Sequence, residues 1–271
     1  MDRIDHALLD ETACQPPTKH RYSLGFARDE AERREAQRLR WRVFAEEMGA
    51  RLASREPGID HDIFDPFCEH LIVRDERSGE VIGTYRLLSP ESACRIGCYY
   101  SEQEFDLTRL RLQRDRMVEA GRSCIHPAHR NGAVIALLWS GLARYMLRGG
   151  YAYLAGCASM SMADGGHGAA AAYERLRAGH LAPVEYQVFP RSLLPLDKLD
   201  SSGPAEPPPL LKGYLRAGAW ICGEPAWDPE FNTADFFVLL PFAQLAPRYA
   251  RHFLGTPSSD HEASHPRATR P

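Results

Sequence analysis

Hydrophobic residues in the middle of the chain change their spacing twice, and the changes mark a strand, a helix and a second strand. Residues 118–125 alternate between apolar and polar as a half-buried strand requires. After the turn residues Pro127 and Gly132, the apolar residues of 132–148 follow a helical spacing, and 151–159 is a second apolar strand. Strand, crossover helix and strand form a βαβ unit, so we expect the two strands to be parallel.

The same spacing predicts further elements on both sides of this unit. Strands are expected at 21–26, 70–74, 81–88, 220–222 and 235–240, and helices at 29–48, 169–178 and 210–219. Residues 201–209 read as a Pro-rich linker before a C-terminal extension. Residues 1–20 and 255–271 are polar and aperiodic, so we expect a flexible arm and a disordered tail around an α/β domain at 21–254.

Two opposite charges interrupt the first central strand, Glu119 and Arg122. Strict alternation places their side chains on opposite faces of the sheet. A charged group in a buried strand is costly unless it is paired or used, so at least one of the two needs a partner or a ligand. A structural ion pair and a functional group both satisfy this requirement.

Other charges fall into two kinds of segment. The loop 59–67 carries Asp62 and Asp65, which form a charged pocket if they meet Arg86 near the end of strand 81–88 and a solvated surface if they do not. Arginines crowd helix 29–48 and segment 105–117. For helix 29–48 we expect a solvated face on the side that carries Arg33, Arg34, Arg38, Arg40 and Arg42, with docking of an acidic partner as the alternative.

Composition excludes several classes of protein. The 271 residues are 44% hydrophobic and 25% charged, with a formal net charge of −3, which argues against a uniformly basic nucleic-acid binder. No apolar run reaches the ~20 residues that span a bilayer, and the first residues lack a signal-peptide pattern, so we expect a cytoplasmic protein.

Cysteine spacing points away from disulfides and metal sites. The seven cysteines form no Cys-x-x-Cys pair, so we expect no disulfide framework and no metal centre. Cys124 and Cys157 lie in strand-like runs, where a reduced thiol packs as a small hydrophobe, and a nucleophilic cysteine is the less favoured alternative. Residues 165–168 contain three glycines but lack the Lys-Ser/Thr of a phosphate-binding loop, so they read as a mobile loop.

Five segments in a fixed order carry a resemblance. They are Leu39-Arg40-Trp41-Arg42-Val43-Phe44, Asp62-x-Phe-Asp65, Gly83-Thr84-Tyr85-Arg86-Leu87-Leu88, Glu119-x-Gly121-Arg122-Ser123 and Pro209-Leu210-Leu211-Lys212-Gly213-Tyr214-Leu215-Arg216. Together, over about residues 22–253, they resemble the ornithine lipid branch of the GNAT N-acyltransferases. The charged positions also resemble acyl-homoserine-lactone synthases, which lack the last segment.

The resemblance implies a fold, a reaction and a set of residues. The fold would be GNAT-like, a central mixed, twisted sheet flanked by helices. The reaction would move a (3-hydroxy)fatty acyl group from acyl carrier protein to the α-amino group of ornithine, giving lyso-ornithine lipid. Glu119, with Arg122, would be catalytic, the carboxylate acting as general base on the amine. Asp62, Asp65, Arg86 and Ser159 would bind the amino acid. The two aspartates would hold its cationic ends, and Arg86 or Arg122 would bind its carboxylate or orient the aspartates.

The turn into the central helix differs from that of acetyl-CoA-dependent relatives. Arg130-Asn131-Gly132-Ala133-Val134-Ile135 does not have the glycine spacing that cradles a pyrophosphate. A carrier-bound phosphopantetheine has no such group, so we expect acyl carrier protein as the donor and no separate cofactor. Because carriers are acidic, Arg114, Arg116 and Arg130 are candidate docking contacts, with a solvated basic face as the equal alternative.

Rival functions stay open at this stage. The chain could acylate another amine such as lysine or glutamine, make an acyl lactone, or bind the carrier protein without catalysis. An amphipathic product also leaves open a peripheral contact with the inner membrane. The sequence does not fix the oligomeric state or the acyl chain.

Overall fold

The computed structural model describes residues 22–52, 54–204, 206–247 and 249. The predicted arm at 1–20 and tail at 255–271 lie outside these residues. In chain order, the helices and strands are β1 (Tyr22–Phe26), α1 (Glu30–Trp41), β2 (Glu69–Asp75), β3 (Val81–Leu88), α2 (Pro90–Ile96), β4 (Phe105–Asp106), β5 (Met117–Ile125), α3 (Ala133–Gly149), β6 (Tyr153–Ser161), α4 (His167–His180), β7 (Phe189–Pro190), α5 (Pro209–Ala217), β8 (Trp220–Ile221), β9 (Ala226–Asp228) and β10 (Thr233–Pro241).

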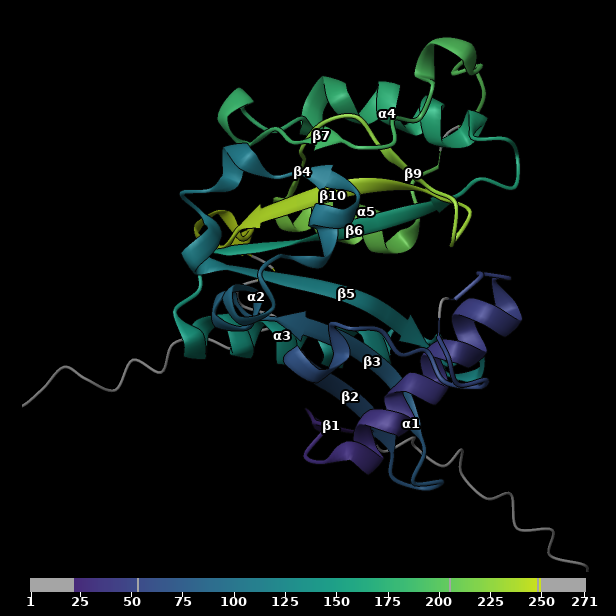
Figure 1. Ribbon diagram of the computed structural model, residues 1–271, viewed down its shortest axis with the longest axis vertical. Helices are drawn as coiled ribbons and strands as arrows, with labels where there is room; N and C mark the ends of the chain where they lie inside the picture. Colours follow the sequence, from purple (N-terminus) through teal and green to yellow (C-terminus); the bar gives the residue numbers. More distant parts are fainter. Residues whose placement is uncertain (1–21, 53, 205, 248, 250–271) are drawn as a thin grey trace, which may run out of the picture.

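A mixed sheet runs through the molecule in the order β1-β2-β3-β5-β6-β10-β8, with β9 paired to β10 (Figure 1). The pair β5–β6 is parallel, which confirms the predicted βαβ unit. The other neighbours in this order are antiparallel. Strand β10 pairs with β6 from Thr233 opposite Ser161 to Pro241 opposite Tyr153, so the segment beyond the Pro-rich linker belongs to the same sheet.

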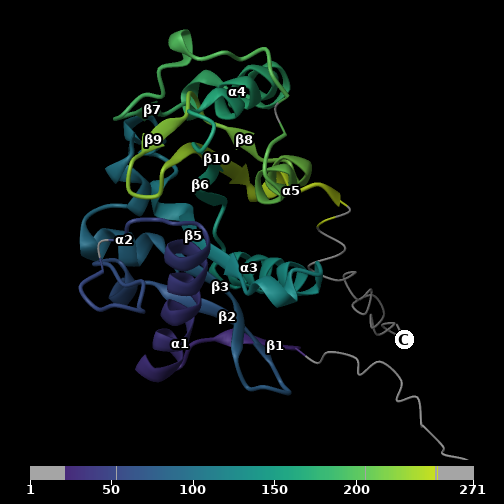
Figure 2. The same ribbon diagram turned by 90° about the vertical axis from the view of Figure 1, so that its right-hand side faces the viewer.

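Helices cover both faces of the sheet (Figure 2). On one face, α3 and α5 pack against apolar residues of the central strands, with Leu138, Leu211 and Phe236 in the shared core. On the other face, α1 packs on β2, β3 and β5 through residues such as Leu39 and Val43. A third cluster joins α2 and the β4 segment to β10, where the Phe105 and Phe237 rings lie 5.7 Å apart. Burial of these side chains supplies the main driving force for the fold.

Predicted and observed elements agree in kind, with shifts of up to three residues at the ends of most of them. The predicted helix 29–48 is α1 with Asp29 as its N-cap, continued by a π-helical segment, Arg42–Glu47. The sequence reasoning missed α2, β4, β7 and β9. Helix α2 has seven residues, and β4, β7 and β9 have two or three. Elements this short have no periodicity to detect and depend on their tertiary partners.

Strands β5 and β6 pair only at their beginnings and then diverge. The pairs are Met117–Tyr153, Val118–Leu154 and Glu119–Ala155. At the point of divergence the backbones approach closely: a Cβ on Gly156 would lie 2.3 Å from the carbonyl oxygen of Ala120. Only glycine fits there, and beyond it the edge of β5 that faces β6 pairs with no strand of the described residues.

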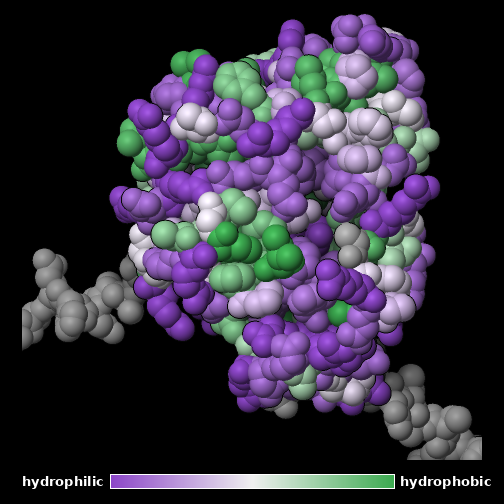
Figure 3. All heavy atoms as spheres, in the orientation of Figure 1, coloured by the Kyte–Doolittle hydropathy of each residue, from purple (hydrophilic) through white to green (hydrophobic). Residues whose placement is uncertain are grey.

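Most of the face seen in Figure 3 is polar, with hydrophobic side chains gathered in small patches. Exposed large hydrophobic residues of the described part of the chain include Ile63, Leu112 and Val184. None of the helices in the described residues has the length and hydrophobicity needed to cross a membrane.

Candidate active site

A β-bulge in β5 sets the direction of Arg122. Gly121 pairs with Arg86, but Cys124 pairs with Thr84, so Arg122 and Ser123 together oppose the single residue Tyr85. Arg122 has φ = 50°, a left-handed conformation that costs a non-glycine residue about 1–3 kcal/mol. The extra residue reverses the alternation of side chains beyond Gly121.

The expectation that Glu119 and Arg122 point to opposite faces is therefore wrong. Glu119 accepts a hydrogen bond from the Tyr100 amide at 2.6 Å, and the Arg122 guanidinium lies over the Tyr100 ring, 5.0 Å from its centroid. Both side chains meet the same residue on the same face. The bulge, which alternation cannot reveal, brings the two together.

Three arginines and three aspartates alternate in a buried network on this face. Arg40 donates to Asp60 Oδ2 and Asp65 Oδ1, both at 2.8 Å. Arg86 donates to both Asp62 oxygens at 2.7 Å and to Asp65 at 3.1 Å. The structure thus brings the predicted residues Asp62, Asp65 and Arg86 together.

Arg122 is held more loosely than the other two arginines. Its Nε lies 3.3 Å from Asp60 Oδ2 without hydrogen-bond geometry, and its Nη2 lies 3.5 Å from Asp62. Its guanidinium is sandwiched between Tyr100 and Phe231, 4.5 Å from the Phe231 centroid. Arg122 Nε therefore remains available as a donor to a further anion. Arg40 Nη1 also lacks a hydrogen-bond partner among the described residues, but the Arg40 side chain is 0% exposed, whereas that of Arg122 is 13% exposed.

Electrostatics keep the network charged. Burial raises the pKa of Asp65, but Arg40 and Arg86 outweigh it and hold that pKa well below the usual range. Burial, together with Arg40, lowers the pKa of the neighbouring His70 to about 4, so this histidine is neutral near pH 7. The network contributes carboxylates and guanidinium groups rather than a titrating histidine.

Arg40 corrects the sequence analysis, which placed it on a solvated face of helix 29–48. Its side chain is 0% exposed. Arg40 lies four residues after Ala36 and four residues before Phe44, and both of these are buried. Residues four apart share a face of a helix, so the spacing could have indicated that Arg40 is buried. The two aspartates that neutralise it, Asp60 and Asp65, come from the loop before β2, which the helix pattern alone cannot foresee.

Glu119 is buried and receives three hydrogen bonds. Its donors are the amides of Tyr100 and Ser101, at 2.6 and 2.8 Å, and the Ser101 hydroxyl. Burial raises the pKa of Glu119, and these donors offset part of the increase. A carboxylate with a raised pKa suits proton transfer near neutral pH, and here it also anchors the turn at Tyr100–Gln103 to β5.

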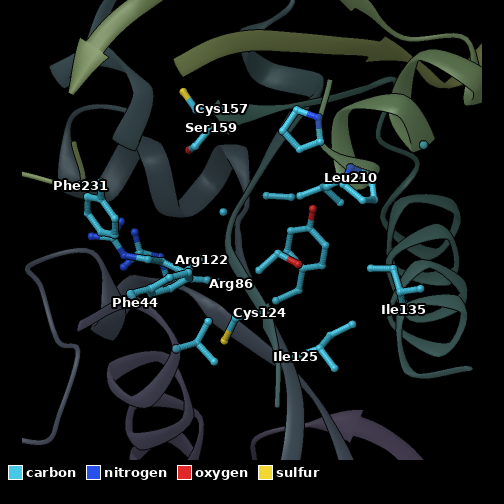
Figure 4. Close-up of a pocket in the computed structure, with 18 of the residues that line it drawn as sticks. Phe44, Arg86, Arg122, Cys124, Ile125, Ile135, Cys157, Ser159, Leu210 and Phe231 are labelled. Atoms are coloured by element: carbon cyan, nitrogen blue, oxygen red, sulfur yellow. The ribbon is translucent and has the colours of Figure 1, made fainter. Parts of the chain in front are cut away.

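A cavity of about 840 Å³ occupies the gap between β5 and β6. Arg86, Arg122, Phe44 and Phe231 line one end, and Ile135 of α3 and Leu210 of α5 line the other (Figure 4). Glu119 lines the cavity as well. The cavity therefore has a charged end toward α1 and an apolar end between α3 and α5.

Ser159 lies on the β6 wall of the same cavity, opposite Asp235 in the β6–β10 register. Of the predicted amino-acid-binding residues it is the one on the far side of the gap from the arginines (Figure 4). The sequence reasoning missed Tyr100, Phe231 and Asp235, which also line the cavity. Tyr100 and Phe231 lie in segments without a regular apolar spacing. Asp235 lies in a mostly apolar strand, which the sequence analysis interpreted as part of the hydrophobic core.

The three arginines proposed to dock a carrier protein are not gathered in one place. Arg114 forms a bidentate pair with Glu102, at 2.8 and 2.7 Å, and Arg116 is exposed just before β5. Arg130 follows β5, pairs with Glu47 at 2.6 Å and borders the cavity. The two groups lie at opposite ends of a nine-residue strand, roughly 25 Å apart. Their docking role stays a prediction.

Cysteines of the described residues are free thiols. Burial raises the pKa of Cys124 to about 12 and that of Cys157 well above its usual value, so neither is a ready thiolate at neutral pH. Cys157, Glu104 and Asp235 form a cluster within the described part of the chain in which one ligand atom from each lies within 4.8 Å of the others.

Comparisons with known proteins bear on the family and the fold of the chain. Residues 39–140 match the acetyltransferase (GNAT) domain model, a stretch that contains the charged network. The L-ornithine N(alpha)-acyltransferase of Rhodobacter capsulatus is 36% identical over 250 residues, 86% of this chain and 94% of the relative. The enzyme of the same name from Brucella abortus is 36% identical over 242 residues, 80% of this chain and 83% of its own.

Among solved structures, the AHL synthase LasI has a TM-score of 0.52 at 14% identity, covering 88% of this chain and 96% of its own. That likeness concerns the fold and confirms the expected GNAT-like architecture. The sequence relatives share a name and extend over most of the chain. The chain is thus an acyltransferase, and it belongs to the L-ornithine N(alpha)-acyltransferase family of the GNAT superfamily.

Proposed function

We propose that this enzyme transfers a (3-hydroxy)fatty acyl group from acyl carrier protein to the α-amino group of ornithine, giving lyso-ornithine lipid. The observation that carries the proposal is one cavity that has an apolar end and a charged end and is also lined by Glu119. An acyl chain suits the gap between α3 and α5, and an amino acid suits the arginine end. The names of the sequence relatives favour ornithine as that amino acid.

In the proposed reaction, Glu119 takes a proton from the α-amine, directly or through a water. The nitrogen lone pair attacks the thioester carbon, and the backbone N–H groups where β5 leaves β6 stabilise the oxyanion. The intermediate then breaks its C–S bond, and the carrier thiolate takes up a proton. The products are an amide and a free thiol.

Arg122 binds the α-carboxylate of the amino acid in this proposal, because its guanidinium still has donors to offer. Arg86 pairs with Asp62 and Asp65 through its Nη1 and orients them instead. The aspartates predicted to bind the amino acid thus act through the network, and Ser159 contributes from the opposite wall.

A supply of acyl carrier protein implies a cytoplasmic enzyme that needs no separate cofactor. The amphipathic product favours a peripheral encounter with the inner membrane. Both statements follow from the proposed substrates.

An assay of purified protein with 3-hydroxyacyl carrier protein and ornithine tests the reaction. We expect ornithine-dependent release of free carrier thiol and an N-acylornithine product in mass spectra. If folded protein releases no carrier thiol with any amino acid, the result would favour a lactone synthase or a non-catalytic carrier-binding module.

The same assay with Glu119→Gln tests the base. We expect kcat to fall by about 100-fold or more, because proton transfer by a positioned carboxylate contributes about that much. The residual rate should keep rising with pH as the amine loses its proton unaided. Circular dichroism serves as the folding control, and a residual rate with the wild-type pH profile would assign Glu119 a purely structural role.

A further inference from the structure

Asp235 is a buried carboxylate in the cavity wall that faces the arginines. It is 4% exposed, and its Oδ1 accepts a hydrogen bond from the Thr233 hydroxyl at 2.9 Å. It lies opposite Ser159 across the β6–β10 pair, and all three residues line the cavity. This wall comes from β6 and β10, whereas the arginines come from β3 and β5.

Within the part of the chain that the structure describes, no basic side chain forms an ion pair with the carboxylates of this wall. The ion pairs of the described residues join Asp60, Asp62 and Asp65 to arginines, but none includes Asp235, Asp228 or Glu104. Asp228 lines the same cavity. Glu104 has a carboxylate oxygen within 4.8 Å of one of Asp235, and its Oε2 is buried and lacks a hydrogen-bond partner among the described residues. Buried carboxylates without a counter-ion are unfavourable, so a cavity that keeps them is suited to a cationic ligand.

The pKa shifts of Glu104 and Asp235 lead to the same conclusion. Burial raises the pKa of both Glu104 and Asp235. Repulsion from Asp235 adds to the increase at Glu104, and repulsion from Asp228 adds to the increase at Asp235, so the pair retains a proton when no cation is present. A cation placed beside Asp235 would restore the second negative charge. The positive charges of Arg86 and Arg122 lie across Tyr100, over whose ring both guanidinium groups sit.

We propose that Asp235 binds the side-chain ammonium group of the acceptor amino acid, with Ser159 and Thr233 beside it. The inference deepens the proposed function and rests on it. A diamino acid has an anionic pole and a second cationic pole, and this cavity offers Arg122 for the first and Asp235 for the second. Glu119 on β5 then meets the α-amine between them. Asp235 thereby selects diamino acids over neutral ones.

A metal ion is the competing cation for the Glu104–Cys157–Asp235 cluster. Burial disfavours the thiolate that a soft metal requires of Cys157. Two carboxylates fall short of the six or more oxygens that calcium prefers. The ammonium group therefore fits the cluster better.

Norvaline has the carbon skeleton of ornithine without the terminal amine, so the pair of substrates isolates this contact. With full-length protein and acyl carrier protein as donor, we expect wild type to favour ornithine by about 100-fold or more in kcat/KM. Asp235→Asn should raise KM for ornithine by about that factor and leave norvaline within about threefold. Asp197→Asn, which changes an exposed acid, is the control and should retain the preference.

Several outcomes would overturn the inference. One is an equal decrease in kcat/KM for ornithine and norvaline in Asp235→Asn, because loss of a purely structural residue would affect both substrates alike. Another is loss of the wild-type preference after chelation, which would identify a metal ion. Calorimetric binding of the two amino acids is independent of turnover: equal affinities in wild type would reject the ammonium site, whereas tighter ornithine binding lost in Asp235→Asn would support it even if acyl transfer failed.

Discussion

The arginines of the first helix show how one residue type takes two roles within three positions. Arg38 is exposed, as the charge pattern predicts, while Arg40 is fully buried between Asp60 and Asp65. The helix alone accounts for the burial of this position, because it belongs to the apolar stripe. The aspartates that make burial of a charge tolerable come from a separate loop.

Replacing Arg40 should therefore destabilise the protein far more than replacing Arg38. Arg40→Met leaves buried carboxylates with fewer partners, and loss of one member of a buried pair typically costs about 3–5 kcal/mol. Arg38→Met should change the free energy of unfolding by less than about 0.5 kcal/mol. Urea unfolding of both variants measures the difference, and similar values for the two would mean that the buried network adds no stability.

Arg122 owes its place in the site to backbone geometry as well as to chemistry. Its positive φ lies at the bulge that turns its side chain toward Glu119 and Tyr100. A regular strand would have sent it the other way. Strain of this kind persists only where surrounding contacts maintain it, here the rings of Tyr100 and Phe231.

At the scale of elements, the parting of β5 and β6 creates the cavity. The two strands are parallel and paired for three residues. Gly156 comes directly after the last pair, where the β6 backbone lies close to the carbonyl oxygen of Ala120. Helices α3 and α5 then flank the opening on the apolar side (Figure 4). The βαβ unit predicted from periodicity thus contains the cavity between its own strands.

Gly156→Ala should disturb this arrangement. The added Cβ meets a backbone oxygen at 2.3 Å, which a side-chain rotation cannot relieve, so β5 and β6 must move apart. We expect a loss of about 1–3 kcal/mol in thermal or urea unfolding and lower acyl transfer.

Gly25→Ala is the matched control, because a Cβ on this glycine of β1 meets nothing within 4 Å. It should leave both stability and activity close to wild type. Equal behaviour of the two variants would contradict a structural need for glycine at the divergence point.

At the scale of the whole molecule, the charges inside the cavity and those on the surface suit different binding partners. The cavity has an arginine wall and a carboxylate wall, which suits a dipolar substrate. Arg116 and Arg130 are the exposed residues among the three arginines predicted to dock a large acidic donor, and Arg130 is already paired with Glu47.

Arg116→Glu tests that docking. If an acidic carrier binds there, KM for acyl carrier protein should rise about tenfold, while KM for a small acyl-pantetheine donor stays unchanged. Arg55→Glu, a charge reversal at another exposed arginine, should leave both values near wild type. Steady-state kinetics at low ionic strength gives the strongest contrast, because salt screens surface charges. Equal KM values in wild type and Arg116→Glu would favour the solvated basic face.

The sequence by itself determined the α/β class, the parallel βαβ unit, the order of the main elements and the family. The spacing of apolar residues and the sequence motifs that indicate these features can be recognised without knowing which residues are in contact. It also identified Asp62, Asp65, Arg86, Glu119 and Arg122 as one group, through the resemblance of their motifs.

Only the tertiary structure decided how those residues face one another. The bulge at Arg122 depends on pairing with β3, and the burial of Arg40 depends on a distant loop. The separation of Asp235 from Arg86 and Arg122 depends on the sheet order, which places β10 beyond β6 from β3 and β5. Each is a property of pairs of residues far apart in the chain. Local periodicity fixes which way a regular strand or helix presents its side chains, but it carries no information about strand registry or about which opposite charge arrives to neutralise a buried one.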